Sequence, residues 1–157
     1  MLDDTTRERA CGNCSACCTT HSVRSIGKPA QQTCPHVALG GGCGVYTTTK
    51  PHECGNYLCA WLRKEVPIEY APEATGVVID HWRMGFYDHV IVEAFICRSA
   101  RTRRQHSAFM KSFIATFSHA VVVYRANNRL KDRVYFPSEL PEHIRLEIVK
   151  RLSLRTA

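Results

Sequence analysis

The sequence has no run of apolar residues long enough to cross a lipid bilayer. Its opening residues, MLDDTTRER, contain no apolar stretch of the kind found in signal peptides. We therefore expect a soluble protein of the cytoplasm that does not associate with membranes. In that reducing compartment, glutathione and thioredoxin keep thiols reduced, so closely spaced cysteines are interpreted as metal ligands rather than as a disulfide framework.

Recognisable catalytic motifs are also missing. The chain has no nucleophile elbow and no zinc-protease helix, and Gly40–Gly42 lacks the following lysine and the flanking strand that a phosphate-binding loop needs. Enzymatic activity stays open on these grounds, because an iron–sulfur centre could still support a redox role.

Acidic residues are fewer than basic ones, which raises the question of a nucleic-acid partner. The chain has 14 acidic residues against 21 lysines and arginines, a formal charge of +7. If eight thiolates held two divalent ions, the net charge would fall to about +3. The basic residues are also dispersed along the chain, so we favour an unidentified protein partner over nucleic acid.

Cysteine is nearly absent after residue 59, where only Cys97 occurs, at the end of an apolar strand that is expected to bury it. Residues 10–62, the cysteine-rich segment, are poor in long apolar runs and rich in turn formers. Bonds to metal would have to offset the entropy of ordering such a segment, which we expect to be disordered without metal. The candidate metal ligands are Cys11, Cys14, Cys17, Cys18, Cys34, Cys43, Cys54 and Cys59.

The most specific signal is the Cys-x2-Cys-x2-Cys-Cys run at residues 11–18. Two intervening residues let a tight turn direct both sulfurs at one ion. Metal–sulfur bonds of ~2.3 Å require that convergence. The side chains of the adjacent Cys17 and Cys18 are expected to diverge. The pair is therefore interpreted as serving different metals, or as one ligand and one packing residue.

The whole cysteine pattern resembles that of the YkgJ-type cysteine-cluster family, described as zinc- or iron-chelating proteins. The family's N-terminal run is followed by a middle cysteine and then by Cys-x-x-Tyr, Arg-Pro, Cys-Arg and Tyr-x-Cys. Here the matching residues are Cys34, Cys43 to Tyr46, and Lys50 to Cys59. Two positions depart from the pattern, because Lys50 and Gly55 stand where the family has arginine.

Two kinds of metal centre fit these cysteines. Eight thiolates can form two closed tetrahedral zinc sites, which we favour. Alternatively, Cys11, Cys14 and Cys17 have the first spacings of a bacterial ferredoxin, although Cys18 then follows too early. The leading hypothesis is a small metal-binding interaction or accessory module. An iron–sulfur redox or methylation accessory enzyme is the alternative, since similar modules accompany flagellin lysine methylases, and a zinc-dependent nucleic-acid binder is the third.

Other side chains in the segment have less specific interpretations. His21, His36 and His52 could replace a cysteine ligand, but eight sulfurs make flanking roles more economical. Tyr46, Tyr57 and Trp61 are expected to pack over the metal sites rather than to stack on bases. Asp80 and His81 alternate along a predicted strand, so they are not expected to form a catalytic pair.

Residues 68–157 are expected to form an α+β domain that packs against the cysteine-rich segment. Alternating apolar residues predict strands at 75–83, 89–97, 120–125 and 133–136, with turns at 84–88 and 127–128. One face of the second strand is expected to be the more buried. Helical spacing of apolar residues predicts helices at 103–119 and from Pro141 onward. The expected order is ββαββα, with a mostly antiparallel sheet and two helices.

Overall fold

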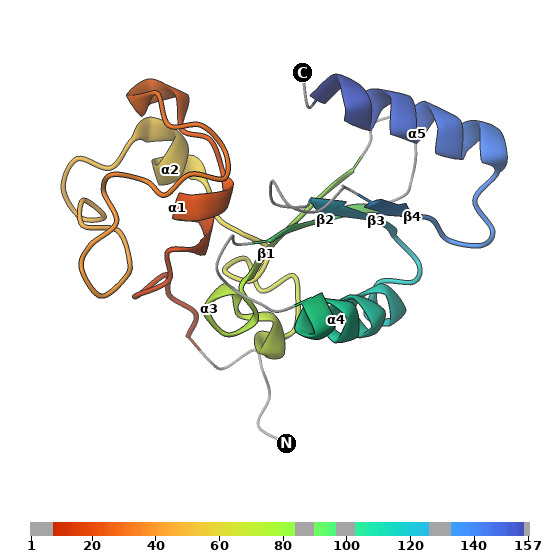
Figure 1. Ribbon diagram of the computed structural model, residues 1–157, viewed down its shortest axis with the longest axis horizontal. Helices are drawn as coiled ribbons and strands as arrows, with labels where there is room; N and C mark the ends of the chain where they lie inside the picture. Colours follow the sequence, from red (N-terminus) through yellow and green to blue (C-terminus); the bar gives the residue numbers. More distant parts are fainter. Residues whose placement is uncertain (1–7, 84–89, 97–102, 126–132, 156–157) are drawn as a thin grey trace.

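The computed structural model describes residues 8–83, 90–96, 103–125 and 133–155, and it confirms the α+β class (Figure 1). None of the helices in these ranges has the length and apolar character required to cross a membrane. The expected turns at 84–88 and 127–128, and Cys97, lie outside the described residues. The elements are α1 Ala16–Thr20, η2 Arg24–Ile26, α2 His52–Asn56, η3 Ile68–Tyr70, α3 Pro72–Thr75, β1 Val77–Arg83, β2 Val90–Ile96, α4 Arg103–Thr116, β3 Val121–Arg125, β4 Arg133–Tyr135 and α5 Glu142–Arg155.

The four strands form a mixed sheet in the order β1-β2-β3-β4. β1 pairs with β2 and β3 pairs with β4 in antiparallel fashion. The central pair, β2 and β3, is parallel, with Ile91 opposite Val121. A parallel pair needs a crossover connection, and α4 lies in the connection between these two strands.

Helices α4 and α5 cover opposite faces of the sheet (Figure 1). Phe109, Phe113 and Phe117 of α4 and its C-terminal end pack against one face. Ile148 and Leu152 of α5 pack against the other. Residues 91 to 94 of β2 are all buried, because a helix covers each face of the sheet. The face of Val92 and Ala94 is still the more buried, as expected, since the other face includes the half-buried Phe95.

The cysteine-rich segment shares a sheet face with α5. Val78 of β1 and Phe95 of β2 lie opposite each other on this face, and they pack with Ala16 of α1 and with Cys59. The amide of Ala60 donates to the carbonyl oxygen of Ile79 at 2.8 Å. The eight cysteines are thereby held beside the β1 edge of the sheet.

Candidate metal centre

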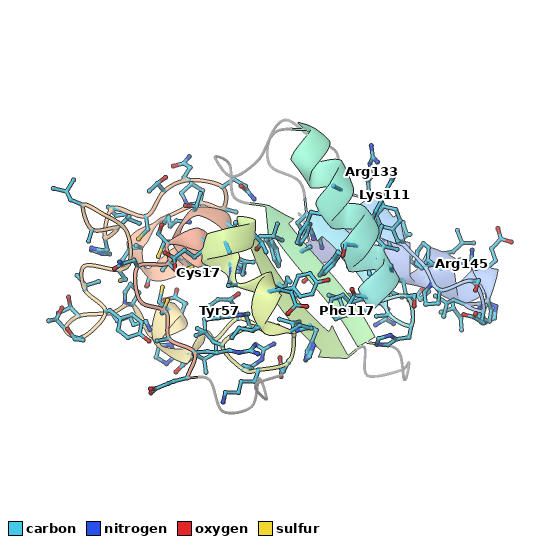
Figure 2. All side chains as sticks on the ribbon, turned by 90° about the horizontal axis from the view of Figure 1, so that it is seen from below. Cys17, Tyr57, Lys111, Phe117, Arg133 and Arg145 are labelled. Carbon is cyan, nitrogen blue, oxygen red and sulfur yellow. The ribbon has the colours of Figure 1, made fainter. Side chains whose placement is uncertain are left out.

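The eight N-terminal cysteines line the same cavity, which has a volume of about 180 Å³. They come from the loop before α1, from α1 itself, from the long loop that follows, from α2, and from the stretch between α2 and β1. All eight are free thiols. Figure 2 shows Cys17 and Tyr57 in this part of the molecule, well separated from Arg145 of α5. Sequence spacing thus identified a set of residues that the fold does bring together.

Main-chain hydrogen bonds define the loops that carry the thiols. The amide of Cys14 donates to the carbonyl oxygen of Cys11 at 2.9 Å and closes the first turn. The amide of Cys34 donates to the carbonyl oxygen of Cys18 at 2.9 Å, which brings the middle of the segment to α1. An antiparallel bridge joins Val37 to Cys43. The backbone therefore holds these loops around the cavity without long helices or strands.

The glycine run at residues 40–42 packs against the first cysteine turn. Gly41 has a φ of +102°, and a Cβ atom there would lie 2.6 Å from the carbonyl oxygen of Asn13. Gly42 has a φ of +74°, and its Cβ would lie 2.7 Å from the oxygen of Gly12. Only glycine fits such an approach at these backbone angles. The run has a structural role here, because it seats the loop before Cys43 on the Cys11–Cys14 turn.

Substitution Gly41→Ala should therefore separate the two loops. We expect a loss of about 1–3 kcal/mol in the free energy of unfolding, because the backbone must leave its angle or the loop must move. Urea denaturation of the metal-loaded protein measures the change. The matched control is Gly55→Ala in α2, where an added Cβ meets nothing within 4 Å. Equal stability of the two variants would contradict the close approach.

Burial and mutual repulsion keep most of the thiols protonated. Burial raises the pKa of Cys11 to about 11, and the neighbouring Cys14, Cys18 and Cys59 add to that rise. Burial is also the largest cause of the raised pKa of Cys14, Cys54 and Cys59. Several thiolates in one cavity repel one another, so the cavity favours a cation that neutralises them.

Cys17 and Cys18 influence each other's ionisation. The interaction with Cys17 lowers the pKa of Cys18 to about 7, and the interaction with Cys18 raises the pKa of Cys17. The expectation that these side chains diverge stays a prediction. Both residues lie on the short helix α1 and line the cavity.

Two lysines supply positive charge beside the thiols. Lys28 is only 5% exposed, and its ammonium donates to the carbonyl oxygens of His21 and Pro29. Burial lowers the pKa of Lys28, while Cys34, Cys18 and other thiolates oppose that shift. Lys50 lies 3.9 Å above the ring centroid of Tyr46, and its charge favours the thiolates of Cys11, Cys18 and Cys54.

The donor set fits a thiophilic metal, although the side chains are not arranged around an ion. In the part of the chain that the structure describes, no three His, Cys, Asp or Glu side chains form a group with ligating geometry. Eight thiols around one cavity are nevertheless the ligand type that zinc and iron–sulfur centres use. Rotation about a cysteine Cα–Cβ bond moves the sulfur while the backbone stays in place.

A polar network that the sequence did not reveal connects the cavity to the sheet. The hydroxyl of Tyr57 donates to both carboxylate oxygens of Asp80, at 3.0 and 2.9 Å. The Nε2 atom of His21 lies 3.2 Å from Asp80, and its Nδ1 atom lies 2.7 Å from the hydroxyl of Thr20. Tyr57 and His21 both line the cavity. Burial, followed by the Asp80 charge, raises the pKa of Tyr57, which keeps its proton available to the carboxylate.

The remaining candidates of the segment have other surroundings. Asp80 and His81 face different partners as expected, since Nε2 of His81 lies 3.0 Å from Glu65. His36 lines the cavity, whereas His52 is exposed on α2 and lies 3.1 Å from the Asn56 amide. Trp61 lines the cavity, and its indole N–H donates to Ile68 at 3.0 Å.

Substitution Tyr57→Phe should weaken the attachment of the cysteine-rich segment to the sheet. Asp80 would lose its hydroxyl donor while 17% of its side chain is exposed, and we expect a cost of about 1–3 kcal/mol. Equilibrium unfolding measures this cost. Tyr46→Phe is the control, because Tyr46 is 46% exposed. A Tyr57 variant as stable as the Tyr46 variant would show that the network contributes nothing to stability.

Comparison of the chain with protein-family models, with curated proteins and with solved structures finds no match.

Proposed function

We propose that this chain is a small intracellular metal-binding protein that acts in the cytoplasm as an interaction or accessory module. Residues 10–62 form its metal unit, and residues 68–157 form the α+β domain that supports this unit. The observation that carries the proposal is the convergence of eight free thiols on one cavity. The resemblance of the cysteine pattern to the YkgJ-type family supports the same assignment.

Zinc is the metal we propose, at about two ions per chain. Thiolate ligands from loops with little secondary structure are typical of structural zinc sites, and eight sulfurs satisfy two tetrahedral ions without an open position. When bound, zinc would cross-link the loops and neutralise the thiolates. The chain's own contribution is to hold the loops by main-chain bonds and to place Lys28 and Lys50 beside the sulfurs.

Reconstitution of the reduced, metal-free chain tests this assignment. Zinc should be taken up from a chromophoric chelator until about two ions are bound. The control Cys97→Ser keeps the eight N-terminal cysteines and should take up the same amount. Failure of the wild-type chain to compete with the chelator would refute the proposal. A brown protein with iron and acid-labile sulfide, obtained anaerobically, would replace zinc by an iron–sulfur centre.

The proposed partner is a protein that contacts the cysteine-rich segment. This segment exposes large apolar side chains, with Leu39 fully exposed and Leu58 half-exposed. The double variant Leu39→Ser/Leu58→Ser should lose metal-dependent association, measured by cross-linking in cells with and without a permeant chelator. The control is Leu146→Ser, because Leu146 is 65% exposed on α5. Association that survives both the double variant and the chelator would argue against this surface.

A further inference from the structure

The contacts of the eight cysteines divide them into an inner group on the sheet and an outer group in the loops. We propose that the chain holds two adjoining four-sulfur metal sites, one formed by Cys11, Cys14, Cys17 and Cys59 and the other by Cys18, Cys34, Cys43 and Cys54. This division rests on the proposed function, and it names the ligands of each ion.

The inner group is defined by packing against β1. Cys14, Cys17 and Cys59 all contact the apolar cluster that includes Ala16 and Val78. Cys59 is 7% exposed and precedes Ala60, whose amide bonds to β1. Cys11 joins Cys14 through the closed turn, and its thiol lies 3.9 Å from the Cys14 carbonyl oxygen. Three of the four cysteines therefore pack on the sheet side of the segment, and Cys11 adjoins Cys14.

The outer group is defined by contacts between loops. The Cys34 amide donates to the carbonyl oxygen of Cys18. Val37 closes a turn that begins at Cys34, and it pairs with Cys43 in an antiparallel bridge. Helix α2, which carries Cys54, is tied to η2 by Glu53, whose carboxylate accepts bonds from the Ser25 amide at 2.9 Å and hydroxyl at 2.6 Å. Cys54 lines the cavity together with Cys18, Cys34 and Cys43.

The boundary between the two groups passes between Cys17 and Cys18. Consecutive residues of an α-helix point about 100° apart, so α1 can direct one thiol to the sheet and the next to the loops. Cys17 contacts the apolar cluster on the sheet, whereas the carbonyl oxygen of Cys18 accepts a hydrogen bond from the Cys34 amide in the long loop. Because Cys17 and Cys18 are consecutive residues of α1, two sites divided between them adjoin.

Cadmium-113 NMR of the full-length chain tests the division. Cadmium replaces zinc in thiolate sites, and each ion gives a resonance whose shift reports the number of sulfur ligands. The wild-type chain should show two resonances of equal intensity in the four-sulfur range. The inner variant Cys14→Ser/Cys59→Ser should lose one of them, and the outer variant Cys43→Ser/Cys54→Ser should lose the other. Metal content should fall by half in each variant.

The outcomes separate this division from the proposed function. Loss of both resonances in each double variant would show one shared cluster and would overturn the division. If the double variants fail to fold, the single variants Cys14→Ser and Cys54→Ser decide. Each single variant should shift one cadmium resonance, a different one in the two variants, and leave the second resonance in place. A single variant that shifts both resonances would overturn the division. A wild-type chain that binds no cadmium would instead refute the proposed function.

Discussion

Removal of the metal should unfold the cysteine-rich segment while the four-stranded sheet stays folded. The segment contains two five-residue α-helices, a three-residue 3-10 helix, isolated bridges and turns. Structural zinc sites supply about 10–16 kcal/mol of binding free energy. Loss of even ~4 kcal/mol accelerates amide exchange about a thousandfold. After treatment with a strong chelator, the amides of Cys34 and Gly44, which bond to Cys18 and His36, should exchange at least this much faster.

The sheet provides an internal control for this experiment. The amides of Val92 and Val122 lie in the buried central pair of strands, and they should keep their protection when the metal is removed. Zinc added back should restore the protection of Cys34 and Gly44. Amides of the segment that remain protected without metal would contradict the account, because the loops would then hold their fold without a cross-link.

Metal binding should release several protons and should weaken steeply in acid. The pKa values of Cys11, Cys14, Cys17, Cys54 and Cys59 are raised above the ordinary thiol value, so these thiols carry protons at neutral pH. Each ligand must lose its proton to bind, and affinity falls about tenfold per pH unit for each proton displaced. Cys18, with a pKa of about 7, contributes only a partial proton.

Calorimetric titration with zinc in buffers of different ionisation enthalpy counts these protons. We expect the chain to release at least five protons when two zinc ions bind at neutral pH, one from each thiol with a raised pKa. One or two protons per chain would contradict thiolate ligation by this set.

Much of the α+β domain could be predicted because its elements have regular apolar periods. The segment AVVVYR gives β3, and the phenylalanines at helical spacing give the buried face of α4. The parallel pairing of β2 and β3 could not be predicted in this way, because periodicity specifies an element and not its neighbour. The burial of both faces of β2 has the same origin, since it depends on where the crossover puts α4 and α5.

The candidate site was predictable to the extent that chelation leaves a spacing signal. The concentration of cysteines before residue 60 marked all eight of the cysteines that line the cavity. The interaction of Asp80 with Tyr57 and His21 has no such signal, because these residues lie 23 and 59 positions away from Asp80 in the sequence. The placement of Cys17 and Cys18 on a helix, α1, likewise had no signal in the cysteine-rich sequence.

The central claim is that the eight N-terminal cysteines hold metal as thiolates. The most direct test is anaerobic purification of the full chain, followed by elemental analysis and by thiol alkylation with mass spectrometry before and after chelation. We predict a colourless protein with about two zinc ions, in which the eight cysteines react only after the metal is removed. A folded protein that contains no metal, and whose eight thiols react at once, would contradict the claim.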